Sequence, residues 1–238
     1  VGFAGQRVIE KLGPEYQYLW QHQQLGTGHA VLMARELLAK SSGDLLVLYG
    51  DTPLLQEETL RGLVELRRNT GAAAAVLTTT VSDPSGYGRM VRDRQGQIIA
   101  IVEDKDATGE QRAINEVNTG VYSFAIEALL PALAELSPGN AQGEYYLTDV
   151  IQILIRRGAK VVGQTTAAAE EVMGPNDRAQ LAATEHCLKL AINRHWMRQG
   201  VSISDPDFTY ISPETEIGPD SLILPGSMIL GQSRIGAN

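Results

Sequence analysis

The sequence predicts an α/β domain with a mostly parallel, Rossmann-like sheet, then a linker helix and the start of a left-handed parallel β-helix. From Gln17 onward, apolar strand segments alternate with amphipathic helical segments, as is typical of α/β domains. From Ile211 onward, an isoleucine recurs every six residues. The 238 residues suffice for one domain and a smaller one, and we place the three parts at 1–177, 178–200 and 201–238.

The first domain contains five candidate strands. Leu45–Leu48 is a continuous apolar run, the mark of a parallel strand buried on both faces. The other candidate strands are residues 74–81, 98–102, 117–124 and 160–165. A short helix is expected around residues 8–12. Longer helices are expected where apolar residues recur at three- and four-residue spacing, over 29–40, 57–68, 125–136 and 144–157.

A longer helix is expected from about Asp177 to Gln199, before Gly200 ends it as a C-cap glycine. Four apolar side chains of this segment are spaced to share one stripe, namely Leu181, Leu188, Ile192 and Trp196. We therefore interpret the segment as a linker helix that lies against one or both domains.

The last part of the chain carries a repeat of six residues. The isoleucines are Ile211, Ile217, Ile223, Ile229 and Ile235, and small hydroxyl residues follow the first four at Thr215, Ser221, Ser227 and Ser233. A strand repeats every two residues and a helix every 3.6, so neither explains a strict period of six. Hexapeptides of this kind are typical of a left-handed parallel β-helix, in which the aliphatic side chain points inward and the small one fits a tight corner.

The two ends of the chain suggest a longer natural protein. Val1 is not an initiator Met, and the first residues resemble the end of a strand and a turn into a helix. The repeat stops at Asn238 with an open coil edge, which would be exposed. We therefore expect that the natural protein continues in both directions.

Composition excludes several classes of protein. The formal net charge of −8, without a basic patch, argues against nucleic-acid binding. An anionic ligand would therefore need backbone N–H groups or a metal ion. The single cysteine, Cys187, excludes an internal disulfide and fits a reducing compartment. No apolar run reaches the length of a membrane span and no signal peptide is visible, so we expect a cytoplasmic protein.

Two segments are candidates for a ligand site in the first half of the chain. Asp51 directly follows a predicted strand, where a metal-binding carboxylate would be useful, although it is also placed to cap the next helix. Gln21 and the run Gln24–Ala30 form the second candidate. Gly26 and Gly28 flank Thr27 just before a helix, where free N–H groups can meet a base or phosphate, but such turns are common. His29 is assigned no chemistry.

Further polar residues stand at the ends of predicted strands. Glu103 and Asn118 are suited to holding sugar hydroxyls, and Gly88 lies in a Gly-Tyr-Gly-Arg turn between strands. Asn176 is equally suited to capping the linker helix. Taken singly, each of these residues fits a structural role as well as a functional one.

Taken in order, these motifs resemble one family. They are residues 24–30, Tyr-Gly-Asp 49–51, Gly-Tyr-Gly-Arg 86–89, 101–107, Asn-Thr-Gly 118–120, 142–149 and Asn-Asp-Arg 176–178, followed by the hexapeptide repeat. This set is similar to the bacterial bifunctional N-acetylglucosamine-1-phosphate uridyltransferase / glucosamine-1-phosphate acetyltransferases. The resemblance covers essentially the whole chain.

The resemblance implies a role for each matching residue. Gln21, Gly26 and Thr27 would contact the uridine of UTP, and Gly88, Glu103 and Asn118 would contact N-acetylglucosamine. Asp51 and Asn176 would hold Mg²⁺, with Tyr49 and Gly50 lining the same wall. The implied reaction is attack of the sugar 1-phosphate oxygen on the α-phosphorus of UTP, which gives UDP-N-acetylglucosamine for cell-wall precursors and releases pyrophosphate without a covalent intermediate.

The chain departs from the family at both ends. The family's Gly-rich nucleotide loop, with its Arg and Lys, has no counterpart here. Most of the β-helix, where the family's acetyl-CoA site and trimer interface lie, is absent too. We therefore expect this polypeptide alone to turn over poorly, and the full-length protein to be a homotrimer that also uses acetyl-CoA.

Two alternatives stay open at this point. One is another sugar nucleotidyltransferase, for glucose 1-phosphate with a thymidylyl or adenylyl group. The other is a non-catalytic assembly module, since some translation-factor subunits keep this two-part architecture without the chemistry. Retention of Asp51, Glu103, Asn118 and Asn176 argues against the second.

Overall fold

The computed structural model describes residues 1–172, 174, 175 and 177–238. The chain divides into two compact units. The first comprises the described residues of 1–50 and 55–173, and the second comprises those of 51–54 and 174–238. Each unit is described separately below.

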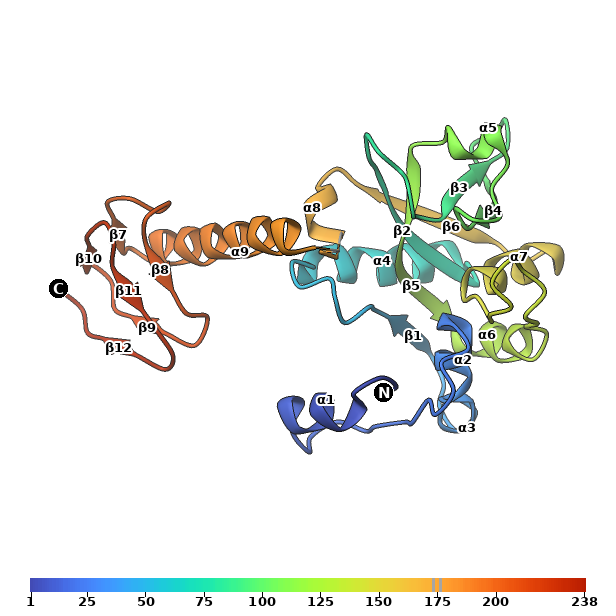
Figure 1. Cartoon of the computed structure of the whole chain (residues 1–238), viewed down its shortest axis with the longest axis horizontal. Helices are drawn as coiled ribbons and strands as arrows, with labels where there is room; N and C mark the ends of the chain where they lie inside the picture. Colours follow the sequence, from blue (N-terminus) through green and yellow to red (C-terminus); the bar gives the residue numbers. More distant parts are fainter. Residues whose placement is uncertain (173, 176) are drawn as a thin grey trace. The chain divides into compact units, whose positions relative to one another are not determined.

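A six-stranded sheet forms the centre of the first unit, in the order β4-β3-β5-β2-β6, with β1 paired to β5 (Figure 1). The strands are β1 Asp44–Val47, β2 Ala74–Thr80, β3 Arg89–Arg92, β4 Ile98–Val102, β5 Glu116–Ala125 and β6 Val161–Thr166. β5 is the longest and pairs with three others, β1, β2 and β3. It therefore fixes the relative register of most of the sheet.

The sheet is mixed, so the prediction of a mostly parallel sheet was wrong. In this sheet only β2 and β6 pair in parallel, whereas β5 runs antiparallel to each of its three partners. β3, which the sequence did not predict, forms an antiparallel pair with β4. The short turn between them, closed by a bond from the Asp93 N–H to the Gln97 carbonyl, cannot carry a parallel crossover.

β1 also differs from its prediction. Its four residues are all half-buried, and Leu48, which was assigned to the strand, lies outside it with 44% of its surface exposed. The cause is its position, because the strand pairs with β5 and with no other strand in the described part of the chain. A continuous apolar run thus marked an edge strand rather than one buried on both faces.

The helices predicted for the first unit are present, but the bounds of several differ from the prediction. They are α1 Gly5–Leu12, α2 Thr27–Leu32, α3 Arg35–Leu38, α4 Glu57–Thr70, α5 Gly109–Arg112, α6 Ile126–Leu133, α7 Thr148–Arg156 and α8 Ala169–Val172. The helix expected over 29–40 is split into α2 and α3, where the Ala34 N–H bonds to the Val31 carbonyl in a tighter turn. The helix expected from 144 begins at Thr148, because residues 145–147 pair with an earlier loop.

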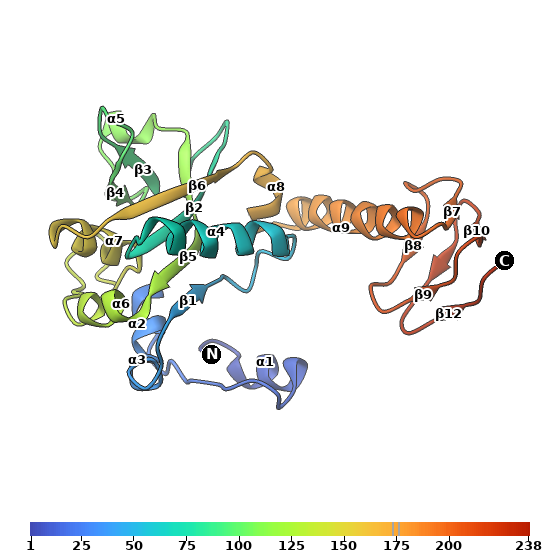
Figure 2. The same cartoon turned by 180° about the vertical axis from the view of Figure 1, so that it is seen from behind.

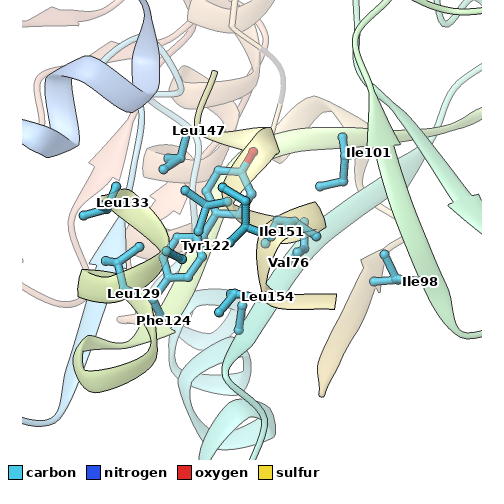
Figure 3. Close-up of a cluster of buried hydrophobic side chains, with 14 of the residues drawn as sticks. Val76, Ile98, Ile101, Tyr122, Phe124, Leu129, Leu133, Leu147, Ile151 and Leu154 are labelled. Carbon is cyan, nitrogen blue, oxygen red and sulfur yellow. The ribbon is translucent and has the colours of Figure 1, made fainter. Parts of the chain in front are cut away.

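Helices cover both faces of the sheet. On one face, Tyr122 and Phe124 of β5 pack with α6 and α7 in a core that includes Leu129 and Ile151 (Figure 3). On the other face, Leu63 of α4 packs with Ala75, Leu77 and Val121. Figure 2 shows α4 crossing in front of β2 and β6. These two cores leave the strand ends free to carry polar groups.

The second unit contains α9, Arg178–Arg198, and six strands of two residues each. They are β7 Ser202–Ile203, β8 Tyr210–Ile211, β9 Glu216–Ile217, β10 Leu222–Ile223, β11 Met228–Ile229 and β12 Arg234–Ile235. β10 lies parallel on β7, β11 on β8 and β12 on β9. In two of these pairs, Ile211 with Ile229 and Ile217 with Ile235, the partners are three hexapeptides apart. The chain therefore coils with three repeats in each turn.

The isoleucines and the small hydroxyl residues of the repeat occupy different positions in this coil. Ile211, Ile217 and Ile223 are buried in one apolar cluster. The small residues sit at corners, where the Ser221 hydroxyl donates to the Gly236 carbonyl at 2.9 Å and the Thr215 hydroxyl donates to the Gly231 carbonyl at 3.1 Å. These hydroxyls thus bond one turn of the coil to the next.

The predicted apolar stripe of α9 is only half used. Ile192 and Trp196 pack on the apolar cluster of the coil, whereas Leu181 and Leu188 are 54% and 37% exposed. Asn193 adds a polar anchor that the sequence reading missed. Its fully buried amide donates to the carbonyls of Pro206 (2.8 Å) and Thr209 (3.0 Å), so the last turns of the helix hold the coil's first loop.

Replacing Asn193 with Ala should destabilise the coil. One buried carbonyl, of Thr209, and one half-buried carbonyl, of Pro206, would lose their donor, at an expected cost of about 2–3 kcal/mol in the free energy of local opening. Hydrogen exchange of the backbone amides in 202–235 measures this, and faster exchange is expected. The control is Thr184→Ala, whose hydroxyl donates to the Gln180 carbonyl of its own exposed helix and should leave exchange in the coil unchanged. Equal exchange in Asn193→Ala and the unaltered chain would contradict the anchoring role.

Candidate functional site

Three of the residues predicted to contact a sugar lie side by side at the ends of three strands. Arg89 of β3 is paired both with Val102 of β4 and with Val117 of β5. The adjoining residues Gly88, Glu103 and Asn118 therefore form the next row, and the Asn118 N–H donates to the Gly88 carbonyl at 2.8 Å. A Cβ atom on Gly88 would lie 3.6 Å from both the Asn118 Cβ and a Glu103 carboxylate oxygen. We call these three residues the polar row.

The Asn118 side chain is fixed by two bonds. Its amide nitrogen donates to the Tyr122 hydroxyl at 2.7 Å, and its amide oxygen accepts from the Gly120 N–H at 3.2 Å. Complete burial raises the pKa of Tyr122 well above its usual value, with smaller contributions from Tyr49 and Glu103. The phenol is therefore protonated at neutral pH. Tyr122 holds the amide in one orientation, and the sequence reading placed it only in a strand.

Glu103 lies on the wall of a pocket of about 220 Å³. The lining also includes Asp106, Tyr146, Thr148, Asp149 and Gln152. The Thr148 hydroxyl donates to the Glu103 carboxylate at 2.8 Å. Burial raises the pKa of Glu103, and the negative charges of Asp149, Asp106 and Asp104 raise it further, although the bond from Thr148 opposes them. The pocket thus offers carboxylate and hydroxyl groups, which suit a neutral polyhydroxyl ligand better than an anion.

Tyr49 reaches the same end of β5. Its ring lies against Gly120, where a Cβ atom would be only 2.1 Å from the ring carbon Cε2. Gly120 also has a φ of +79°, which favours glycine over other residues. The Asn-Thr-Gly motif therefore needs its glycine so that a tyrosine ring can lie directly on the backbone. Gly50, which follows Tyr49, has no neighbouring group within 4 Å of a potential Cβ.

Gln21, Gly26 and Thr27 form a second cluster. The Gln21 amide donates to the Gly26 carbonyl at 3.0 Å and lies 3.1 Å from Nδ1 of His29. The Thr27 hydroxyl accepts a bond from the Leu147 N–H at 3.1 Å. The loop is therefore held against the segment 145–147.

The glycines of this loop have a packing role that the sequence reading did not foresee. A Cβ atom on Gly26 would approach the Tyr145 carbonyl oxygen to 2.6 Å, and one on Gly28 would approach it to 2.9 Å. The Gly28 N–H donates to that same oxygen at 2.7 Å. The close approach that these glycines allow is thus to a neighbouring segment of the chain. That segment leads into Tyr146 and Thr148, so it connects the second cluster with the pocket.

Two residues were predicted as metal ligands, Asp51 and Asn176. Asp51 falls in the second unit, where a Cβ on Gly174 would lie 2.8 Å from its carbonyl oxygen and 3.2 Å from its carboxyl carbon. Asn176 lies outside the described residues. The capping role considered for it belongs to Asp177, whose carboxylate accepts from the Gln180 N–H at 2.7 Å.

The described residues contain neither a metal cluster nor a membrane-spanning helix. No group of three or more His, Cys, Asp or Glu side chains is placed to hold a metal ion there. No helix in the same residues is long and apolar enough to cross a membrane.

Comparison with known proteins gives a consistent family. A family model described as nucleotidyl transferase matches residues 6–196. The chain is 50% identical over 236 residues to the Bifunctional protein GlmU of Halalkalibacterium halodurans, an alignment that covers 99% of this chain and 52% of that protein. It is 46% identical over 236 residues to the protein of that name from Caldanaerobacter subterraneus subsp. tengcongensis, covering 99% and 51%. The chain thus spans about half the length of these curated relatives.

One solved structure is more distantly similar. It is a crystal structure of a UDP-glucose pyrophosphorylase complexed with UDP-glucose, with 18% sequence identity and a TM-score of 0.49. The similarity covers 68% of this chain and 64% of that one.

Gly120→Ala should be far more destabilising than the matched change Gly86→Ala. Both glycines have a positive φ, +79° and +81°, but only Gly120 has a neighbour within 4 Å. Backbone strain should cost each variant about 1–2 kcal/mol of unfolding free energy. The clash with Tyr49 should add about 1–3 kcal/mol in Gly120→Ala. Urea denaturation measures both, and equal losses would show that the Tyr49 ring does not rest on Gly120.

Glu103→Gln should stabilise the fold at neutral pH. A carboxyl whose pKa is raised on folding favours the folded state while protonated, and that contribution is lost as pH rises through the folded-state pKa. The variant should therefore have a higher free energy of unfolding than the unaltered chain at pH 7, and the difference should vanish below about pH 4. Glu110→Gln, which changes an exposed carboxylate, is the control. A difference independent of pH would contradict the assigned burial of Glu103.

Proposed function

The chain belongs to the nucleotidyl transferase family, and we propose that it carries the uridyltransferase site that makes UDP-N-acetylglucosamine. The reaction transfers a uridylyl group from UTP to N-acetylglucosamine 1-phosphate and releases pyrophosphate. One observation carries this proposal above the others. Gly88, Glu103 and Asn118 form one row at three adjoining strand ends, and Glu103 of this row lines a pocket, in a chain about half identical over almost its whole length to proteins named as bifunctional GlmU.

The polar row supplies the sugar end of the proposed site. The Glu103 carboxylate and Asn118 amide are fixed by Thr148 and Tyr122, so they are preorganised acceptors and donors for sugar hydroxyls. The pocket beside Glu103 is lined with carboxylates, which disfavours an anionic group there. The phosphate of the sugar 1-phosphate would consequently face away from this pocket, toward the nucleotide.

Gln21, Gly26 and Thr27 are assigned to the uridine end. Gln21 bonds to Gly26, and Thr27 bonds to the segment 145–147, which continues into the sugar pocket through Tyr146 and Thr148. A ligand in which a diphosphate joins a base to a sugar would fit such an arrangement, with the base at the cluster and the sugar at the pocket. Tyr49 and Gly50 are assigned to the wall between the two ends.

Enzymes of the nucleotidyl transferase family generally use a divalent metal ion, and Mg²⁺ is proposed here. Mg²⁺ in proteins is often held by one or two protein oxygens together with substrate phosphates, and does not need a cage of carboxylates. Asp51 and Asn176 are assigned as its ligands, and the Asp51 carboxylate suits this hard cation. When bound, the ion would neutralise phosphate charge in a chain of net charge −8.

Catalysis in this proposal needs no covalent intermediate. The polar row and the Gln21 cluster hold the sugar 1-phosphate and the nucleotide so that the phosphate oxygen of the sugar faces the α-phosphorus of UTP. Such positioning removes most of the entropic cost of bringing two substrates together. Among the described residues, the chain contributes binding and orientation, with no side chain assigned as a nucleophile.

We propose that the full-length protein has a longer β-helix and a second activity in addition to the site described here. The repeat coil, 201–238, is assigned as the start of a left-handed β-helix, after the transferase domain 1–177 and the linker helix 178–200. Complete relatives span about twice this length. For the complete protein we propose acetylation of glucosamine 1-phosphate from acetyl-CoA, a homotrimeric assembly and a cytoplasmic location.

The proposal is tested by Mg²⁺-dependent binding of UDP-N-acetylglucosamine, measured calorimetrically. We expect Mg²⁺ to tighten binding to the unaltered chain, and Asp51→Asn to bind only as weakly as the unaltered chain does in EDTA. Glu127→Gln, an exposed charge change on α6, should behave like the unaltered chain. Tighter binding of dTDP-glucose or ADP-glucose would favour another sugar nucleotidyltransferase, and no binding of any nucleotide sugar would favour an assembly module.

A further inference from the structure

Arg89 is a buried charge directly beside the polar row. Its side chain is 2% exposed, which makes it one of the largest fully buried side chains in the chain. Removing a guanidinium from water is costly unless its partners are well placed, and an apolar residue of similar size often fills such a position without loss of stability. Its burial therefore calls for an explanation beyond filling space.

The partners of Arg89 come from two different strand ends. One terminal nitrogen donates to the Asp104 carboxylate at 2.8 Å, and the other donates to the Tyr87 carbonyl. Nε has no hydrogen-bond partner within the described part of the chain. Tyr87 immediately precedes Gly88, and Asp104 immediately follows Glu103. One planar group thus ties together the two backbone segments that carry the row.

We propose that Arg89 is a positioning residue that holds Gly88 and Glu103 in register for the sugar. This role rests on the proposed function of the polar row. Successive side chains on a strand point to opposite faces, so Arg89 projects away from the face that carries the Glu103 and Asn118 side chains. It acts on the ligand through the backbone segments it joins.

Few other contacts hold this corner of the sheet. β3 pairs with β5 at Arg89 and Val117, beside the single backbone bond from Asn118 to Gly88, and the β3–β4 pairing shifts register just before Arg92. Gly86, at φ +81°, has no neighbouring atom within 4 Å of a potential Cβ. A guanidinium suits such a place because its rigid fork of donors meets two acceptors at once, which an ammonium group does less well.

The test measures, in the whole chain, the affinity for UDP-N-acetylglucosamine, the affinity for UDP and the thermal stability of each variant. The variants are Arg89→Met, Arg89→Lys and the double variant Arg89→Met/Asp104→Asn, which also removes the carboxylate left without its partner. Arg92→Met is the matched control, because Arg92 is on the same strand and paired with Glu116 but does not flank the row. Binding of UDP-N-acetylglucosamine and of UDP is measured calorimetrically, and the melting temperature by circular dichroism.

For Arg89→Met we expect the Kd for UDP-N-acetylglucosamine to rise about tenfold or more, because small misplacements of binding groups are costly, with the Kd for UDP unchanged. The double variant should regain the melting temperature of the unaltered chain but not its affinity for UDP-N-acetylglucosamine. Arg89→Lys should regain part of that affinity. Arg92→Met should lower the melting temperature and leave the ratio of the two affinities unchanged.

Three outcomes would overturn the proposal. Equal weakening of both ligands in Arg89→Met, or recovery of both stability and affinity in the double variant, would assign Arg89 to the fold alone. An unaltered chain that binds UDP but not UDP-N-acetylglucosamine would overturn the proposed function, and this role with it. The last result is distinguished from the other two because it concerns the unaltered chain.

Discussion

The pairing of β5 with three other strands is the constraint on which the first unit depends. Its ten residues run antiparallel to β1, β2 and β3, and eight of them are buried. One end of the strand supplies Tyr122 and Phe124 to the apolar core, and the other supplies Asn118 to the polar row. Because side chains alternate along a strand, a slip of one residue would move Asn118 to the opposite face and separate it from Glu103. The register that builds the core therefore also builds the site.

Burial of carboxylates in and beside the polar row lowers the stability that this core provides. Glu103 and Asp149 both have raised pKa values caused first by burial, which means that their charged forms are disfavoured where they lie. The hydrogen bond from the Thr148 hydroxyl compensates in part at Glu103, and the positive charge of Arg156 does so at Asp149. Carboxylates kept in a partly dry pocket at such a cost are more readily explained by a ligand than by folding, because a folding role would be served by apolar residues.

Some of this arrangement could be predicted from the sequence, and the reasons differ by element. Ile98–Val102 was placed at its observed bounds. The six-residue repeat predicted five inward isoleucines, of which Ile211, Ile217 and Ile223 are buried and the last two, Ile229 and Ile235, are partly buried against the same cluster. The direction of β5 could not be predicted, since apolar runs do not say which strand they pair with. Leu45–Leu48 shows the same limit: its composition predicted two buried faces, but its edge position exposes Leu48. The family resemblance brought Gly88, Glu103 and Asn118 together only as a set, and their single row follows from strand register. Arg89 and Asn193 were missed because the sequence does not show that a polar residue is buried.

The glycines near the site show how backbone contacts shape it. Gly26 and Gly28 lie against the Tyr145 carbonyl, and Gly120 lies against the Tyr49 ring. At each of them a Cβ atom would come too close to its neighbour. In a Gly-rich turn before a helix, the usual expectation is an approach to phosphate. In this fold the approach is first to another part of the chain, and it accompanies the bond from the Leu147 N–H to Thr27, between the pocket residues Tyr146 and Thr148. Glycine thus acts on the site indirectly, because it lets segments pack closely enough for polar groups from distant positions to meet. A larger residue at any of these glycines would force the packed segments apart and so separate the groups that they carry.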